Sequence, residues 1–467
     1  MKRQRLRHLG VLAVLACTAA ACGSDSKSAS TTAAATTTAG AVTTVAGSTL
    51  ASTADSSAGT TAASPADSTG SSTASSAANS SGTSDTGAST GTVRGVTATE
   101  IKIGGLGEAN TYVGAEAGAK ARFERANREG GINGRMIKYV GFKDDGADSG
   151  RNLDLSRQLV TSDGVFAISP VVTQAFLPQS SDYLAQQKVP FVGWGFMPGF
   201  CGNAYGYGFN GCLIGTDYIN SGLVDPVLKA VGKPMDQIKV AIQSGDDITG
   251  KSGAAQYANT IAKRGAKVVY NEANIPTDTQ TTDYSPFATA VAATNPDVVY
   301  ASARFADVVG LTTALRQAGY KGPVVNFVTY APGLLEAQPD LATALEGVWV
   351  NTQIPPSEGG SAATKQLADD LSAIKESPFV TLGASVGYWS ADVLVQQLQA
   401  AGKDLTPASF QAAMQHFTYK PADGGIGPVS FPGDQTAPTP CAAIVAIEGG
   451  KYKQLLPMAC YESYKAK

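Results

Sequence analysis

The sequence predicts an α/β fold with two parallel sheets, each covered by helices on both faces. From residue 101 onward, short runs of β-branched residues alternate with segments of helical spacing. This alternation is typical of parallel sheets, because each strand returns to its neighbour through a helix. More than eight strands are expected over roughly 350 residues, which favours two sheets over one.

The expected strands are short. In chain order they are IKIGGL at 101, VFAIS at 165, VPFVGW at 189, KVAIQS at 239, KVVYNEA at 267, DVVYAS at 297, PVVNFV at 323 and GVWVNT at 347. Near the C-terminus, AAIVAIEGGKYKQLLP has the pattern of a hairpin.

The best-defined helix follows the first expected strand, in GAEAGAKARFERANREGG. Two sides are distinguished by helical spacing: Gly118, Arg122, Arg125 and Glu129 on one, and Ala115, Ala119, Phe123 and Ala126 on the other. Gly130 and Gly131 are suited to a left-handed cap, so the helix is expected to end there.

The first 22 residues have the pattern of an export signal. A cationic start precedes an apolar segment, about Leu9 to Ala21, that is too short for a permanent membrane span. TAAACGS follows and resembles the lipobox of bacterial lipoproteins, which implies lipidation of Cys22. Ala19 stands where that pattern usually has Leu, and Cys17 is a rival position. A cleaved signal without a lipid is the alternative.

Residues 23–92 are almost entirely Ser, Thr, Ala and Gly. Such a segment has too little apolar surface to offset the entropy lost on ordering, so we predict a disordered tether. As a flexible coil it would span on the order of 45 Å.

Four cysteines remain after the signal, as two local pairs. Among the three possible connectivities we predict Cys201–Cys212 and Cys441–Cys460. A zinc site is the alternative, but neither pair has a histidine nearby or the CxxC spacing, so no metal is expected.

Composition argues for a binding protein. The net charge is −3 with no basic block, so nucleic acid is not an expected partner. After the signal the single histidine is His416, in the helical pattern PASFQAAMQHF, where a partly exposed helix position explains it. With the cysteines paired there is no thiol nucleophile, and the carboxylates lack an obvious acid–base partner. We expect no enzymatic activity and no cofactor.

A series of segments resembles the type I periplasmic binding proteins, and most closely the branched-chain amino-acid receptors of ABC importers. In order these are GVTATEIKIGGLGEAN, AKARFERANREGGINGRMIKYVGFKDDGAD, LVTSDGVFAISPVVTQAF, QQKVPFVGW, TTDYSPFATAVAATNPDVVYAS and ALRQAG. The resemblance covers about 97–456. It implies two Rossmann-like lobes, joined by three crossings, with a ligand cleft between the carboxyl ends of their strands.

The resemblance and the composition together divide the chain into six parts. We expect a lipoprotein signal peptide at 1–22, the tether at 23–92, lobe 1 at 93–216, lobe 2 at 217–352, a return to lobe 1 at 353–427, and a C-terminal hairpin crossing to lobe 2 at 428–467.

The stretch GDDITGKS at 245–252 matches the phosphate-binding P-loop pattern. Asp246 and Asp247 would place two carboxylates where a polyphosphate must bind, which argues against nucleotide. No later strand ends in an acidic residue of the Walker-B kind. We interpret Gly250 as a close-packing position and Lys251 as a solvated residue of the first helical turn.

The resemblance also supplies cleft candidates. In lobe 1 they are Thr173, Gln174 and Ala175 after the third strand, Trp194, Gly195, Phe196 and Met197 after the fourth, and Thr111 or Tyr112 above the site. In lobe 2 they are Arg304, Tyr330 and Asp246.

These candidates depart from the amino-acid receptors. Tyr330 stands where those receptors have the acidic residue that binds ammonium; Asp246, Asp247 or Glu108 would have to supply that charge. The aromatic residues with Arg304 suit an apolar or aromatic carboxylate instead. The alternatives are a surface salt bridge for Arg304 and core packing for Trp194 and Phe196.

The predicted protein is therefore a monomeric solute receptor, lipid-anchored to the outer face of a bacterial cell membrane. It would capture an amino acid or a related amide or carboxylate and deliver it to an ABC permease. A sensor of the same fold that signals to a membrane partner is the second hypothesis, and an extracytoplasmic enzyme is the third.

Overall fold

The computed structural model describes residues 92–215, 219–277, 279–376 and 380–462. The expected signal peptide, Cys22 and nearly all of the expected tether lie outside these residues. Two sheets account for all the strands of the described part, which confirms the α/β prediction with two lobes.

The first sheet has five parallel strands in the order β2-β1-β3-β4-β5. The strands are β1 (Glu100–Gly107), β2 (Met136–Asp144), β3 (Ala167–Val172), β4 (Phe191–Gly193) and β5 (Gly206–Gly208). Every residue of β3 is buried, as a central strand with helices on both faces requires. We call this sheet and its helices the first lobe.

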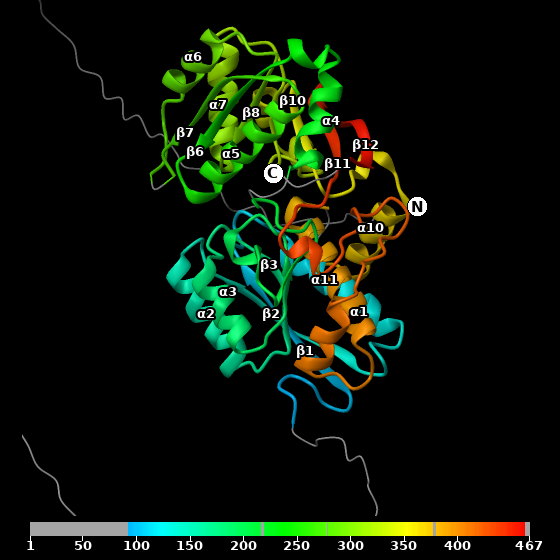
Figure 1. Cartoon of the computed structure of the whole chain (residues 1–467). Helices are drawn as coiled ribbons and strands as arrows, with labels where there is room; N and C mark the ends of the chain where they lie inside the picture. The colour runs from blue at the N-terminus through cyan, green and yellow to red at the C-terminus, as the bar shows by residue number, and fades with distance from the viewer. Residues whose placement is uncertain (1–91, 216–218, 278, 377–379, 463–467) are drawn as a thin grey trace, which may run out of the picture. The chain divides into compact units, whose positions relative to one another are not determined.

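Helices of the first lobe come from two distant parts of the chain. They are α1 (Ala115–Arg128), α2 (Ser149–Thr161), α3 (Pro178–Gln186), α10 (Ala362–Ile374), α11 (Leu382–Ala401) and α12 (Pro407–Met414). Figure 1 shows α2 and α3 on one side of the sheet and α1 and α11 on the other.

Helix α1 is buried on both of the sides that helical spacing distinguishes. Ala119 and Phe123 are buried. Gly118 and Arg122 are buried as well, because α11 packs on their side of the helix. A Cβ at Gly118 would lie 1.9 Å from the Ala384 carbonyl oxygen of α11. The two following glycines, Gly130 and Gly131, have φ values of 101° and 76°, as the predicted helix end requires.

The second sheet has seven strands in the order β12-β11-β10-β9-β8-β6-β7. They are β6 (Lys239–Gly245), β7 (Lys267–Ile275), β8 (Val298–Ser302), β9 (Val324–Asn326), β10 (Val348–Thr352), β11 (Cys441–Glu448) and β12 (Lys451–Cys460). β6 to β10 are parallel, and β11 and β12 form the predicted hairpin, which pairs antiparallel with β10. We call this sheet and its helices the second lobe.

Helices of the second lobe are α4 (Ser221–Val231), α5 (Ile248–Lys263), α6 (Ser285–Ala293), α7 (Phe305–Gln317), α8 (Leu334–Ala337) and α9 (Pro339–Ala344). Short 3₁₀ turns complete the described part: η1 (Pro198–Phe200), η2 (Met235–Gln237), η3 (Ser357–Gly359) and η4 (Gly433–Gln435).

Both predicted disulfides form. Cys201–Cys212 closes the loop that contains β5, and Cys441–Cys460 joins paired residues of β11 and β12. His416 is exposed and lies two residues beyond the end of α12. None of the helices in the described residues is long and apolar enough to cross a membrane.

Candidate functional site

The loops after β1 and β4 place an aromatic cluster at the carboxyl edge of the first sheet. The Trp194 ring lies 5.0 Å from Phe196, and Tyr112 lies 6.2 Å from each of them. With Met197 they form what we call the aromatic edge. All four side chains are at most 3% exposed. Burial raises the pKa of Tyr112, so its hydroxyl is neutral.

Two contacts join the aromatic edge to the second lobe. The Trp194 and Phe327 rings meet edge to face at 5.9 Å, and Phe327 directly follows β9. The Thr249 hydroxyl, in the first turn of α5, donates to the Met197 sulfur over 3.3 Å. The edge therefore faces the carboxyl ends of β6 and β9, where open α/β sheets bind ligands.

Behind Phe327 the second lobe contains a cavity of about 10 Å³. Its lining includes Tyr257, Tyr300, Asn326 and Asn351. The rings of Tyr257 and Tyr300 lie 4.9 Å apart. Such a volume holds about one water molecule, so this cavity is too small for an organic ligand.

Several buried polar groups at these two edges lack a hydrogen-bond partner within the described part of the chain. They are the Trp194 indole N–H, the Asn326 side-chain amide nitrogen and the Ser244 hydroxyl at the end of β6. A buried unpaired donor costs roughly 1–3 kcal/mol, so these groups are uncommon in a packed core. The indole and the amide are donors that suit an oxygen acceptor.

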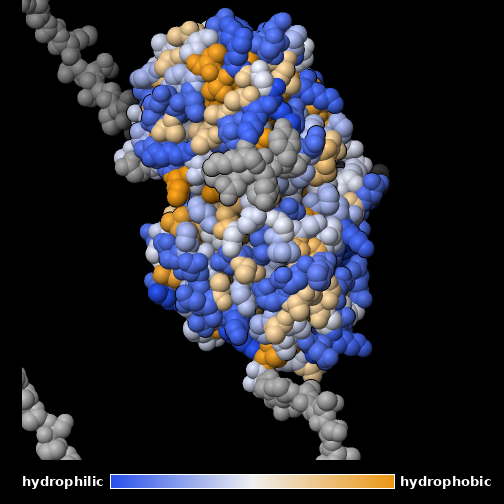
Figure 2. Space-filling view, viewed as in Figure 1, coloured by the Kyte–Doolittle hydropathy of each residue, from blue (hydrophilic) through white to orange (hydrophobic). Residues whose placement is uncertain are grey.

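An exposed apolar side chain lies in a loop near each edge. Val113, after β1, is 59% exposed, and Ile248, the first residue of α5, is 56% exposed. Hydrophobic areas are small and separated on the face drawn in Figure 2.

A family model described as "Periplasmic binding protein" matches residues 100–451. The chain belongs to the periplasmic binding protein family. It is accordingly a solute-binding protein, as its two-sheet architecture leads one to expect. No curated protein matches the chain.

Solved structures of this family share the fold. A fatty acid ABC transporter substrate-binding protein from Thermomonospora curvata is 21% identical, with a TM-score of 0.64, covering 79% of this chain and 95% of that one. A solute-binding protein from R. palustris in complex with 4-hydroxybenzoate is 19% identical, with a TM-score of 0.60 and coverages of 78% and 97%. LivJ from Streptococcus pneumoniae, in complex with isoleucine, is 18% identical, with a TM-score of 0.60 and coverages of 77% and 100%.

In this periplasmic binding protein GDDITGKS joins β6 to α5 without forming a phosphate cradle. Asp247 caps α5, and its carboxylate accepts from the Gly250 amide over 2.6 Å. Asp246 accepts from the amide and hydroxyl of Thr277, bonds that lower its pKa. Lys251 is exposed. A Cβ at Gly250 would lie 2.2 Å from the Gly245 carbonyl oxygen, so close packing explains the glycine.

Most of the other lobe 1 candidates form hydrogen bonds with residues of their own lobe. The Thr173 hydroxyl donates to Asp145 and accepts from the Ala175 amide, both over 3.0 Å. The Gly195 amide donates to Asn210 over 2.8 Å, and its carbonyl accepts from Leu213 over 2.7 Å. Gln174 is partly exposed at the same sheet edge. The backbones of Ala175 and Gly195 thus have little left for a ligand.

A group of carboxylates lies beside the aromatic edge, at the ends of β1 and β2. Burial raises the pKa of Glu108, which accepts a hydrogen bond from Thr111. Burial also raises the pKa of Asp145, which is fully buried and accepts from Asn152 and Thr173. Asp144 accepts from the amides of Ala109 and Gly146, so its pKa is lowered. Glu108 is the member of the group that keeps partial exposure and a raised pKa.

Arg304 caps the start of α7 and is heavily engaged. Its guanidinium pairs with Asp307 over 2.7 Å and donates to the carbonyls of Pro276, Thr277 and Thr279. This is the salt bridge at a helix start that the sequence left open as the alternative. A ligand carboxylate would have to displace Asp307, which is 1% exposed and also accepts from Tyr284.

Tyr330 is bonded to the 3₁₀ turn η3. Its hydroxyl donates to Glu358 over 2.6 Å and accepts from the Ser357 amide over 2.7 Å. Its ring meets Tyr452 of β12 at 5.2 Å. Tyr330 therefore belongs to the packing of the hairpin against its own lobe.

Sequence reasoning missed Thr249, Asn326 and Phe327. Phe327 lies in PVVNFV, which was expected to be strand throughout, whereas β9 ends at Asn326. Their positions could have identified them, because residues just beyond the carboxyl end of a parallel strand face the cleft. Within the described residues, no group of three or more His, Cys, Asp or Glu is placed to hold a metal ion.

Proposed function

We propose that this protein is the lipid-anchored receptor of an ABC importer, and that it carries a small apolar or aromatic molecule bearing a carboxylate or amide oxygen. The observation that supports this most is the aromatic edge, together with its unpaired indole N–H. Ligand pockets of this kind combine apolar walls with a few polar groups that fix orientation.

The apolar part of the ligand would lie between the two lobes. Trp194, Phe196 and Tyr112 offer ring faces and edges from one side, and Phe327 offers a ring from the other. Aromatic side chains give large contact areas at small entropic cost, so they suit a planar or aliphatic body.

The oxygen of the ligand would accept from the Trp194 indole and the Asn326 amide. These donors lie at the facing edges of the two lobes, and neither has a partner among the described residues. Binding would satisfy them, which is a gain that a purely hydrocarbon ligand cannot provide.

The proposed site has no evident partner for an α-ammonium group. A buried ammonium needs a carboxylate, and Asp246 and Asp247 are already bonded to Thr277 and Gly250. Glu108 is the remaining candidate, but burial disfavours its ionised form. The solved relative in complex with 4-hydroxybenzoate holds a ligand without this group, whereas LivJ holds isoleucine, which has it.

Entry of the ligand requires the lobes to separate. The cavity beside Phe327 is about 10 Å³, and the Trp194–Phe327 contact stands in the way of anything larger. We propose an open form that admits the ligand and a closed form that the permease recognises.

A thermal-shift panel on the purified protein tests the ligand class. The panel holds leucine and isoleucine, aliphatic and aromatic carboxylates, and the matching amides. A ligand at a hundred times its dissociation constant should stabilise the native state by ~2.7 kcal/mol. The proposal predicts a shift with an apolar carboxylate or amide that is reduced to about half in Trp194→Phe. A shift with the amino acids alone would contradict it.

The anchor is a separate part of the proposal. Cys22 would carry the lipid, and residues 23–92 would let the lobes reach the permease. Metabolic labelling with a fatty acid should mark the wild-type protein and leave Cys22→Ser unmarked. Label retained by Cys22→Ser but lost in Cys17→Ser would move the anchor to Cys17.

A further inference from the structure

One cavity of the described part of the chain lies away from the aromatic edge. It is an open groove of about 800 Å³ in the first lobe, between α1, α10, α11 and the segment 416–422 that follows α12. Its lining shares no residue with the aromatic edge. We call it the lobe 1 groove.

Positive charge exceeds negative charge in the lining. Arg122, Arg125 and Lys420 line the groove together with a single carboxylate, Asp392. Asp392 is already neutralised: it accepts from Arg122 and, over 2.5 Å, from the Tyr419 hydroxyl, and Arg125 lies 3.6 Å away.

The charged residues next to the groove do not cancel the excess of positive charge in its lining. Arg125 and Arg128 share one further carboxylate, Asp370, over 3.1 and 3.2 Å. Glu129 lies 3.6 Å from Arg125 but is 63% exposed, so water screens it. The groove therefore presents a positive potential to solvent, which attracts anions.

Three buried donors of the lining residues have no hydrogen-bond partner in the described part of the chain, and one of them, Nε of Arg125, lies 3.6 Å from Glu129. They are Nη1 of Arg122, Nε of Arg125 and the indole nitrogen of Trp389. Arg122 is 5% exposed and Trp389 2% exposed. An unpaired guanidinium nitrogen is costly at this depth, and an anion that reaches it through a shift of the lining side chains would satisfy it.

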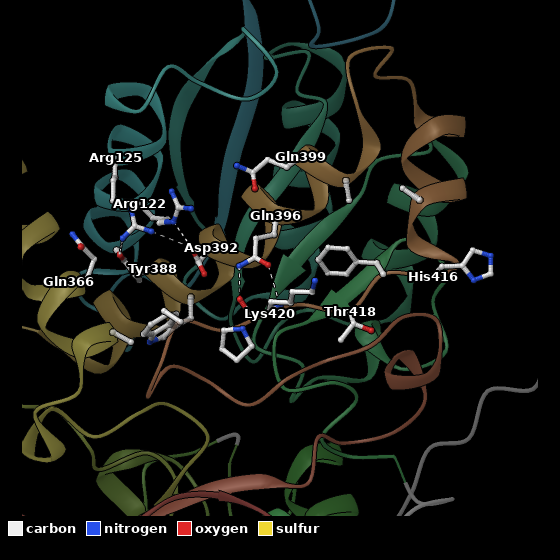
Figure 3. Close-up of a pocket in the computed structure, with 17 residues that line it drawn as sticks. Arg122, Arg125, Gln366, Tyr388, Asp392, Gln396, Gln399, His416, Thr418 and Lys420 are labelled. Atoms are coloured by element: carbon white, nitrogen blue, oxygen red, sulfur yellow. Dashed lines mark hydrogen bonds and ion pairs between the residues drawn. The ribbon is translucent and has the colours of Figure 1, made fainter.

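Lys420 lines the same groove, and its backbone is held by Gln396. The side chain of Gln396 donates to the Lys420 carbonyl over 3.0 Å and accepts from its amide over 3.1 Å. Figure 3 shows Arg122 and Arg125 grouped around Asp392 and Tyr388, with Gln396 and Lys420 beside them and His416 pointing away. The cationic groups are thus spread along the groove, and more than one acidic group can be received.

We propose that the lobe 1 groove is a second ligand site, for a small polar organic anion with two or more carboxylates. The spread of cationic groups favours several charges on the ligand, and the side chains of Gln366, Gln399 and Thr418 at the rim offer hydrogen bonds to its polar body. The site differs in chemistry from the aromatic edge, so it does not depend on the function proposed above.

Tryptophan fluorescence can separate the two sites, because the chain has three tryptophans and each site contains one. Trp389 lines the groove, Trp194 belongs to the aromatic edge, and Trp349 lies in β10. The purified protein is titrated with citrate, with acetate as the single-carboxylate control and inorganic phosphate as the charge-only control. Variants are Trp389→Phe, Trp194→Phe, Lys420→Glu and Lys267→Glu.

The proposal predicts a saturable response to citrate that persists in Trp194→Phe and disappears in Trp389→Phe. Lys420→Glu should weaken citrate binding at least tenfold. Lys267→Glu, an exposed position in β7 with the same charge change, should bind as the wild type does. Both lysines are exposed, so neither variant should impair folding.

Three outcomes would overturn the proposal. A citrate response lost in Trp194→Phe and kept in Trp389→Phe would assign binding to the aromatic edge. If acetate or phosphate bound as tightly as citrate, the groove would not select a ligand with several carboxylates. The absence of a response to citrate in the folded wild-type protein, checked by calorimetry, would leave the groove without this ligand.

Discussion

The candidate residues at the carboxyl edges of the two lobes differ in how their side chains are used. On the first lobe, Trp194, Phe196 and Met197 project a mostly apolar surface and leave an indole N–H unpaired. On the second lobe, Asp247 and Arg304 are bonded to their own lobe. Polar residues at the carboxyl edge of a sheet can thus serve the structure alone. Buried aromatic residues at such an edge, which look like core residues, can be the ones that contact a ligand.

The largest effect is expected from Trp194→Ala. Removing a buried tryptophan typically costs about 3–5 kcal/mol, and the ligand-induced thermal shift should vanish as well. Thermal unfolding with and without ligand measures both.

Trp194→Phe is the matched control, since it keeps a ring but loses the indole donor. Its ligand affinity should fall about tenfold, a loss of ~1.4 kcal/mol, with a small change in stability. Wild-type affinity in this variant would show that the indole N–H does not bind the ligand.

Arg304→Gln should have the next largest effect, on stability rather than on binding. It leaves the buried Asp307 without its cation, and breaking such a pair costs a few kcal/mol, here about 2 because Arg304 is partly exposed. Denaturant unfolding measures the loss, and Arg304→Gln with Asp307→Asn should recover part of it. Lost affinity at unchanged stability would instead place Arg304 in the ligand site.

Asp247→Ala should cost about 1 kcal/mol, as the loss of a helix N-cap does. Lys251→Ala should change stability by less than about 0.5 kcal/mol, because its side chain is exposed. Neither variant, nor the wild type, should show a thermal shift with Mg-ATP. Such a shift, abolished by Lys251→Ala, would restore the P-loop interpretation.

The smallest expected effects are opposite pH dependences of two edge carboxylates. Hydrogen bonds from Thr277 lower the pKa of Asp246, so its contribution is present above the usual value of 3.8 and is lost as the pH falls through the lower folded pKa. Burial raises the pKa of Glu108, so its contribution is present below 4.5 and is lost as the pH rises through the folded pKa.

Urea unfolding between pH 3 and 7 measures this contrast. At neutral pH, Asp246→Asn should be less stable than the wild type, and Glu108→Gln should be equally or more stable. At the acidic end the penalty of Asp246→Asn should shrink. A stability penalty for Glu108→Gln that appears only at neutral pH would contradict the raised pKa.

The sequence predicted the lobes well because their determinants are local. Apolar runs and glycine stops define strands such as β6 and the hairpin β11–β12, and nearby cysteines define both disulfides. The three-residue strand β5, with the sequence Gly-Tyr-Gly, was missed because it has no β-branched residue. Its pairing with β4 is set by the tertiary context.

The site was less predictable because hydrogen-bond partners come from distant segments. The sequence allowed a salt bridge of Arg304 at a helix start, but its further acceptors at Pro276 to Thr279 lie more than 20 residues away. Phe327 looks like part of a strand, yet it meets Trp194 across the two lobes. The lobe 1 groove joins α1 to α11 over a separation of 270 residues between Arg122 and Asp392, which no sequence pattern reports.

The central claim is that the aromatic edge holds the ligand and that its carboxylate or amide oxygen accepts from Trp194. The most direct measurement is a crystal structure of the protein grown with the carboxylate or amide that gives the largest thermal shift. The account predicts that molecule between the Trp194 and Phe327 rings, with an oxygen about 3 Å from the indole nitrogen or from the Asn326 amide. A ligand found in the lobe 1 groove, with the Trp194–Phe327 contact intact, would contradict it.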